Sequence, residues 1–399
     1  MGGASASRSN PAREAAVGLL VTALALASAR AGRATTFQDA FGSKTRPMGT
    51  ALARSIGSAL PVISASPGII YTFNPEIGAP ERETVILGQL LLERAETLGR
   101  NEWNVGLSYQ YVKLDTFNGD DIRKLHDSTP ILLNPKRGCP STRFTIPRFG
   151  IDLDTHEFTA SGTLGLTDDL DLNLTVPVLY SNFGLVLKTQ DLQIRRTITP
   201  PGFPVRASEL GVGDIFVRGK YRFLDAEWTR LAMGVVLRVP TGNEANFQGT
   251  GAVELAPMLY ASSRSVRLWR SIHLQAYLNA GFDVNADDVD RTAPRYGVGV
   301  DLGLAERLTA AVAVLGRHPL SGIERPGFFN VTRCVGRREF PAPLFGIRDR
   351  RPDIYDVSIG GRVNLWRDTL IGFVNALVPL NADGFRAEVI PLAGLEATF

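Results

Sequence analysis

The chain has 399 residues, of which 44% are hydrophobic, with 40 Gly, 24 Pro and a formal net charge of +3. This charge is too small to indicate nucleic-acid binding, and the many Gly and Pro residues suit strands and turns better than long helices. Only four His and two Cys occur, without His-x-x-x-His or Cys-x-x-Cys spacing, so no metal site is predicted. The glycine-rich GVGD at 211–214 lies in a strand pattern rather than opening a helix, so no nucleotide cofactor is predicted either.

The N-terminus has the pattern of a secretory signal. Two arginines precede an apolar run at residues 15–29, and small residues follow. The run is too short to span a bilayer as a stable helix. We therefore expect a signal peptide over 1–31, cleaved after Ala29 or Ala31, with a buried N-terminal helix as the alternative.

Residues 32–82 form the next expected region. Its first part, to about residue 66, is rich in small residues and weakly helical in pattern. It predicts a periplasmic arm or a plug inside a barrel, and a mobile leader left outside is the alternative. After the signal, no stretch approaches 18 uninterrupted apolar residues, which excludes a protein that crosses the membrane with helices.

From about residue 102 onward, segments of about ten residues alternate between apolar and polar side chains. In one of them, Leu170, Leu172 and Leu174 alternate with Asp171 and Asn173. Period two places alternate side chains on opposite faces of a strand. The predicted strands are, approximately, 102–114, 155–166, 169–180, 212–224, 229–240, 252–262, 270–283, 294–304, 308–317, 354–366, 369–379 and 387–399.

Short and long connections between these strands alternate along the chain. Every second connection is short: 167–169, 225–228, 263–269, 305–307 and 367–368. The others are mostly long: 115–154, 181–211, 241–251, 284–293 and 318–353, with a short one at 380–386. This parity is typical of a transmembrane antiparallel up-and-down β-barrel with long outer loops and short periplasmic turns. We predict an all-β barrel over 83–399 with twelve strands, or fourteen if 83–95 and 68–74 also pair.

The last strand would end on an aromatic residue, Phe399. An aromatic side chain suits the membrane interface, so this strand is expected to close the barrel with Phe399 at the periplasmic side. The predicted location is the bacterial outer membrane, after signal-directed export. The predicted partners are outer-membrane lipid, a small-molecule solute and the outer-membrane insertion machinery, which would act through the strand ending at Phe399.

The alternation also predicts which side chains face the lumen. The candidate solute-contacting residues are Arg218, Lys220, Arg222, Arg230, Arg238, His273, Gln275, Asn279, Arg295, Asp301, Asp356 and Arg362. The basic members lie mainly on the strands 212–224 and 229–240, and would favour anionic solutes such as carboxylates. Alternatively, the arginines pair with Asp171, Asp301 and Asp356 and simply fill a small barrel.

A search for enzyme chemistry finds one weak motif. His126 and Ser128 have the His-x-Ser spacing of outer-membrane phospholipases, but they lie in a predicted loop with no rigid element to hold them together. We expect no enzyme activity, with a hydrolase as an alternative. A structural or adhesive barrel, acting through loops 115–154 and 318–353, is another.

Two cysteines lie in predicted outer loops. Cys139 is in RGCPST and Cys334 is in TRCVGR. An exported protein meets an oxidising compartment. We therefore expect a disulfide between them.

Three stretches carry a family resemblance: LGVGDIFVRGKYRFLDAEW, LAMGVVLRVPTGN and GTGAVELAPMLYAS. They resemble the core of bacterial outer-membrane proteins grouped as transporters of the meta pathway of phenol degradation, distant relatives of FadL-type channels. The resemblance runs from about Glu93 to Phe399. It implies a barrel for passive uptake of small, hydrophobic or aromatic molecules. In FadL-type channels, an N-terminal plug and a lateral opening in the wall let such molecules pass.

Overall fold

The computed structural model describes residues 36–41, 53, 56, 60–68, 70–74, 79–82, 86–126, 131–132, 144–191, 196–199, 203–269, 271–305, 307–320, 323–335, 338–350, 353–366 and 368–399. All of them belong to one compact unit, Thr36–Phe399. The predicted signal peptide lies outside the described residues. Among the described residues, no helix is long and apolar enough to cross a membrane.

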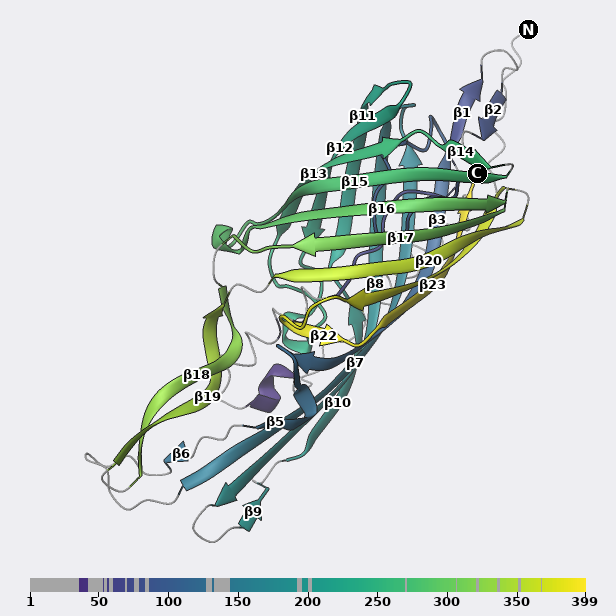
Figure 1. Cartoon of the computed structure of the whole chain (residues 1–399). Coiled ribbons are helices and arrows are strands. Elements are labelled where there is room, and N and C mark those ends of the chain that lie inside the picture. The colour runs from purple at the N-terminus through teal and green to yellow at the C-terminus, as the bar shows by residue number, and fades with distance from the viewer. Residues whose placement is uncertain are drawn as a thin grey trace. The chain divides into compact units, whose positions relative to one another are not determined.

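Twelve strands among the described residues form an antiparallel sheet that closes on itself (Figure 1). They are β3 (Trp103–Phe117), β7 (Phe144–Gly165), β8 (Leu170–Asp191), β11 (Ile215–Asp225), β12 (Thr229–Val239), β13 (Glu254–Ser263), β15 (Ile272–Asn285), β16 (Ala293–Ala305), β17 (Leu308–Arg317), β20 (Ile354–Trp366), β21 (Leu370–Pro379) and β23 (Ile390–Thr398). Neighbours in the chain are neighbours in the wall, and β23 pairs with β3 to close it. The predicted up-and-down barrel of twelve strands is confirmed.

Shorter elements accompany the wall. They are η1 (Gln38–Phe41), β1 (Tyr71–Asn74), β2 (Ala79–Arg82), β4 (Asp120–Asp121), η2 (Ile122–Lys124), β5 (Leu125–His126), β6 (Ile131–Leu132), β9 (Arg196–Ile198), β10 (Val205–Val212), η3 (Glu244–Asn246), β14 (Val266–Trp269), η4 (Val289–Arg291), β18 (Ile323–Val335), β19 (Arg338–Arg350) and β22 (Phe385–Ala387). β10 continues the wall beside β8 before β11 begins. β1 pairs with β2 rather than with the wall, and residues 86–102 form no strand, so the fourteen-strand alternative is wrong.

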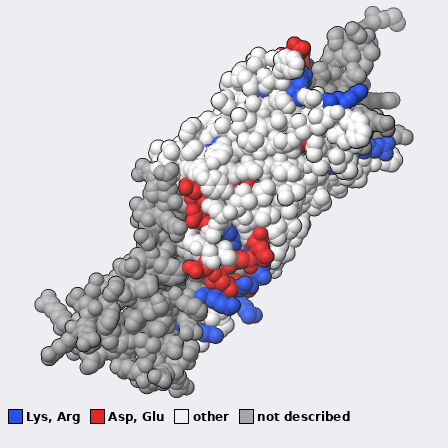
Figure 2. Space-filling view, viewed as in Figure 1, with Lys and Arg blue, Asp and Glu red and all other residues white. Residues whose placement is uncertain are grey.

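The wall is apolar outside because the alternation runs as predicted. Leu172, Val235, Val298 and Val314 are all more than 40% exposed, as expected for side chains that face lipid. Figure 2 shows a mostly uncharged described surface, with acidic and basic residues gathered mainly toward its two ends. The barrel therefore presents an apolar band between two charged rims.

Aromatic side chains mark the two edges of this band. Trp228, Trp269 and Trp366, at the short turns, are 78%, 69% and 63% exposed. Tyr355 lies at the other end of β20, eleven residues before Trp366 (366 − 355). At about 3.3 Å per residue and a tilt of about 45°, that distance corresponds to about 25 Å of height, the thickness of an outer-membrane apolar band.

Two strands run farther than predicted. β7 and β8 pair without interruption from Gly165 and Asp171 to Thr145 and Asp191, so much of the expected loops 115–154 and 181–211 is strand. The loop 318–353 likewise contains the paired β18 and β19. The predicted loop boundaries were wrong because the strands continue beyond the lipid band, where apolar alternation is no longer required and polar residues such as Asp154 take outward positions.

An aromatic core fills one side of the barrel near the long loops. Phe37 stacks on Phe183 with ring centroids 5.1 Å apart, and Phe247 meets both rings at 5.7 and 5.4 Å. All three side chains are at most 3% exposed. The segment that begins at Thr36 is thereby tied to β8 and to the loop between β12 and β13.

Candidate functional site

Two segments that precede the wall in the chain lie inside it, and we call them the inner segments: residues 60–68 and 86–98. They run side by side, since the amide of Ser64 donates to the carbonyl oxygen of Leu90 at 2.9 Å. The wall holds them from different sides. The Gln110 Nε2 on β3 donates to the Pro61 carbonyl oxygen at 3.2 Å, and the Leu87 amide donates to Thr309 Oγ1 on β17 at 3.0 Å.

Glycines on β16 make room for the second inner segment. A Cβ at Gly297 would lie 2.4 Å from Leu92, and one at Gly299 would lie 2.9 Å from both Gln89 and Leu92. Gly303, two inward positions farther, faces Ile86. The inward glycines of RYGVGVDLGLA, interrupted by Asp301, thus form a glycine track on the lumen face of β16. The sequence contains this signal, but the strand pattern alone did not reveal it.

Glu93 anchors the second inner segment at both its backbone and its side chain. Its amide donates to Asn279 Oδ1, and Asn279 Nδ2 donates to its carbonyl oxygen, both at 2.8 Å. Its carboxylate accepts from the Ala65 amide and the Ser66 hydroxyl. Burial alone would raise the pKa of Glu93, but the charges of Lys220 and Arg218 and these hydrogen bonds outweigh it and lower the pKa. Glu93 therefore stays ionised and joins the two inner segments to each other.

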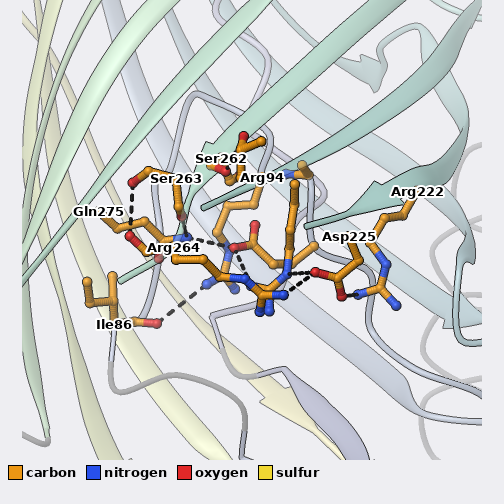
Figure 3. A network of polar contacts seen from close by, with 12 residues as sticks. Ile86, Arg94, Arg222, Asp225, Ser262, Ser263, Arg264 and Gln275 are labelled. Atoms are coloured by element: carbon orange, nitrogen blue, oxygen red, sulfur yellow. Dashed lines mark hydrogen bonds and ion pairs between the residues drawn. The ribbon is translucent and has the colours of Figure 1, made fainter. Parts of the chain in front are cut away.

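A polar network, which we call the latch, fixes the same segment at the short-turn end (Figure 3). The buried carboxylate of Glu96 meets Arg230 Nη1 at 3.1 Å and accepts from Gln275 Nε2 at 2.6 Å. Arg230 also contacts Asp225 at 3.1 Å. Arg94, fully buried, donates to the carbonyl oxygens of Pro67 and Ile86. The latch therefore ties wall residues of β11, β12 and β15 to both inner segments.

Further wall side chains bind the inner segments directly. Lys220 donates to the Glu96 carbonyl oxygen at 2.7 Å and lies 3.5 Å from Asp171. Asp301 accepts from Gln89 Nε2 at 2.6 Å. Two strands farther along the wall, Arg362 on β20 donates to the Gln89 carbonyl oxygen at 2.8 Å. Polar lumen groups thus satisfy backbone groups that have no strand partner, as burial requires.

The predicted lumen residues fall into three places. Seven of them contact the inner segments or the groups that hold them, and each is at most 8% exposed: Arg218, Lys220, Arg230, Gln275, Asn279, Asp301 and Arg362. Arg238, Arg295 and Asp356 lie near the long loops. Arg222 pairs with Asp169 at a short turn, and His273 Nδ1 lies 3.4 Å from Ser265. Contact of any of these predicted lumen residues with a solute stays a prediction.

Near the long loops, charged side chains line the lumen from β12 around to β22, and we call them the charged ring: Arg238, Glu254, Asp283, Arg295, Arg317, Asp356 and Arg386. Arg238 lies 2.8 Å from Asp214 and 3.4 Å from Glu254, and Arg386 pairs with Asp356. Most arginines of the lumen are therefore paired, although their carboxylates are largely not the three proposed from the sequence. Sequence reasoning missed Glu96 because the inner segments carry no period. Asp214 and Glu254 lie within the predicted strands 212–224 and 252–262, where the period gives the direction of a side chain but not its partner.

Between the charged ring and the inner segments lies a cavity of about 240 Å³, the inner cavity. Its apolar lining comes from the inner segments and from the wall: Leu60, Ile63, Leu92, Met258 and Leu315. Arg218 and Tyr260 are also at its surface. The cavity lining therefore combines apolar side chains with charged side chains of both signs.

Several predictions concern residues outside this description. Ser128 and Cys139 lie outside the described residues, and the side chains of His126 and Cys334 are not described either. The hydrolase alternative and the disulfide stay predictions. Among the described residues, no three or more His, Cys, Asp or Glu side chains are arranged as metal ligands.

No protein-family model and no curated protein sequence matches this chain. Solved structures of outer-membrane proteins do. An outer membrane channel from Pseudomonas putida F1 matches with 12% identity and a TM-score of 0.45, over 76% of this chain and 98% of that one. The transport unit of the autotransporter AIDA-I from Escherichia coli matches with 10% identity and a TM-score of 0.36, over 75% and 90%. A Pseudomonas aeruginosa FadL homologue matches with 12% identity and a TM-score of 0.30, over 75% and 90%. Function must therefore be argued from the lumen of this chain itself.

Proposed function

We propose that this chain is an outer-membrane channel for the passive passage of small molecules, in which the inner segments, residues 60–68 and 86–98, act as a plug. The observation that carries this proposal is the lumen itself, in which two irregular segments are bound by polar side chains of the wall. A barrel that served only as a surface anchor would have no need of a cavity at its outer mouth. A cavity above a plug suits a channel that admits its solute before letting it pass.

In this proposal, a solute passes the charged ring, occupies the inner cavity and leaves toward the short-turn side when the inner segments shift. The driving force is the solute gradient alone. The apolar lining of Leu60, Ile63 and Leu92 favours small hydrophobic or aromatic molecules over sugars. The resemblance to transporters of the phenol meta pathway points to the same class, and outer-membrane location after export and the lack of enzyme activity belong to the same proposal.

The test is single-channel conductance together with liposome uptake of purified protein. Because the plug and its hydrogen bonds occupy the lumen, we expect little steady ionic conductance. Toluene should enter the liposomes faster than it enters protein-free ones, while a small sugar should not. A large steady conductance with sugar uptake would contradict the plugged channel and indicate an open pore.

A further inference from the structure

Three neighbouring wall strands, β3, β7 and β8, carry short neutral polar side chains on their lumen face, and we call these side chains the hydroxyl stripe. The stripe consists of Asn104, Ser108, Thr159, Ser161, Thr163, Asn173 and Thr175. Ser108 lies opposite Thr159. Thr163 lies between Asn104 on β3 and Asn173 on β8. Because hydroxyl and amide groups both donate and accept hydrogen bonds, this face of the lumen suits water.

Two small cavities lie between the hydroxyl stripe and the first inner segment. The first polar cavity, of about 30 Å³, lies between residues 60–63 and the strands β7, β8 and β11. The second polar cavity, of about 20 Å³, lies between residues 63–66 and the strands β3, β7, β20 and β23. A water needs a space of about 10–15 Å³ and polar partners. Both cavities therefore have room for water.

Polar groups at the second polar cavity lack a protein partner. Arg362 is 2% exposed, and its Nε has no hydrogen-bond partner among the described residues. In the same part of the chain, the hydroxyls of Ser108 and Ser161 make no hydrogen bond, although both side chains face the lumen and neither is buried. Buried polar groups are normally satisfied by protein or by ordered water. Water in this cavity would satisfy all three groups.

The cavities follow one another along the first inner segment. The inner cavity and the first polar cavity share residues 60–63 in their linings. The two polar cavities share Ile63, Thr159 and Thr175. The lining of the second reaches Asn104, the second residue of β3, which donates through Nδ2 to Thr398 Oγ1 at 2.9 Å. A row of water-sized spaces thus leads from the inner cavity nearly to the short turns.

The charges that border the two polar cavities are largely paired. At the first, Arg238 lies 2.8 Å from Asp214, and Glu157 accepts hydrogen bonds from two neutral side chains. At the second, Arg362 lies 2.8 Å from Glu396. An ion would have to shed its hydration shell to enter spaces of this size, and that desolvation is costly. The row of spaces therefore fits water but not hydrated ions.

We propose that the hydroxyl stripe and the two polar cavities form a single-file path by which water crosses the plugged barrel, while ions and sugars are excluded. The stripe replaces hydrogen bonds that water leaves behind, and apolar lining residues such as Leu179 and Phe373 hold water weakly enough for it to move on. The inference rests on the proposed function only in taking the inner segments as a plug. Water could refill the lumen by this path when a solute leaves.

Osmotic shrinkage of proteoliposomes that contain the full chain tests the path. Stopped-flow light scattering records the shrinkage after mixing with sucrose. The proteoliposomes should shrink faster than protein-free liposomes of the same size and lipid. Planar-bilayer recordings of the same preparation should show little steady ionic conductance.

Two variants on different strands close the path at the second polar cavity. Ser161→Leu and Ser108→Leu each fill this space and remove a hydroxyl. Each should lower the protein-dependent shrinkage rate about tenfold, because water must give up hydrogen bonds to pass an apolar side chain. Either variant gives a reading if the other does not fold. Gly162→Leu is the matched control on β7: a Cβ there meets nothing within 4 Å, and the rate should stay that of the wild type.

Shrinkage no faster than in protein-free liposomes would overturn the water path. An unchanged rate in a folded Ser161→Leu or Ser108→Leu variant, or an equal loss in Gly162→Leu, would also overturn it. Fast shrinkage together with a large steady conductance would indicate an open pore instead.

Toluene uptake separates this inference from the proposed function. Toluene uptake without fast shrinkage would overturn the water path and leave the channel intact. Fast shrinkage that is lost in Ser161→Leu, without passage of toluene, would support the water path and contradict the channel.

Discussion

At the residue scale, one side chain tests the lipid-facing register. Val235 is 44% exposed in the middle of β12. An arginine there would face hydrocarbon, so Val235→Arg should destabilise the barrel by about 2–4 kcal/mol. Denaturant unfolding of the protein in lipid vesicles measures this loss.

The matched control is Val289→Arg. Val289 is 67% exposed in η4, between β15 and β16, so the same change should alter stability by less than about 0.5 kcal/mol. Equal losses at both positions would contradict the placement of β12 in lipid. The inward neighbour Gly234 is a poor control, since a Cβ there would lie 2.7 Å from the Tyr260 ring.

The inward direction of the lumen arginines was predictable from the sequence, but the residues that they contact were not. Period two alone turns Arg218 and Arg230 inward, because successive residues of a strand face opposite sides. The groups that meet them, Ile63 and Glu96, lie in segments without a period. No spacing rule therefore connects them to the wall.

At the scale of elements, the glycine track on β16 can be tested by filling it. Gly299→Leu would place side-chain atoms where Gln89 and Leu92 now lie, and should displace the second inner segment. Its loss of contact with the wall should appear as a rise in steady ionic conductance. Planar-bilayer recordings at fixed protein amount measure it.

Gly162→Leu is the control for that experiment. Gly162 lies on β7, and a Cβ there would meet nothing within 4 Å, so the added side chain displaces no segment. Its conductance should match the wild type. A rise in both variants would mean that the leucine perturbs the wall rather than the plug.

The strands themselves were largely predictable, whereas their outer ends were not. The β12 and β17 boundaries agree with the expected segments 229–240 and 308–317 to within about one residue, because lipid imposes apolar alternation along their full length. β7 and β8 continue beyond the lipid band, where inward side chains such as Phe183 still pack in the aromatic core but outward ones no longer need to be apolar.

At the scale of the whole molecule, the belt of tryptophans sets the position of the barrel in the bilayer. Trp228, Trp269 and Trp366 are exposed at the short-turn end, where indole rings prefer the interface. Their fluorescence should be quenched more strongly by lipids brominated near the headgroup than by lipids brominated at the chain ends. The opposite order would place the short turns deep in the hydrocarbon and contradict the proposed membrane band.

The number of strands followed from a property of the whole chain, the alternation of short and long connections. That alternation depends on the order of the connections along the chain, so an error in the boundaries of any one strand does not change it. The content of the lumen depends instead on contacts such as that between Gln89 and Asp301, whose partners are more than 200 residues apart. Such contacts produce no sequence pattern over the length of a turn or a strand, so they were not predictable from local periodicity.

The closing pair of the wall has a consequence for the order of folding. β23, the last strand, pairs with β3, the first, and Trp103 exchanges two backbone hydrogen bonds with Phe399. A contact so distant in sequence is slow to form and leaves two strand edges unpaired until it does. The inner segments precede every wall strand in the chain, so a wall that curls around them needs no threading of chain through a closed barrel. In that order the sheet closes around the inner segments, which act as a template for the curvature of the wall.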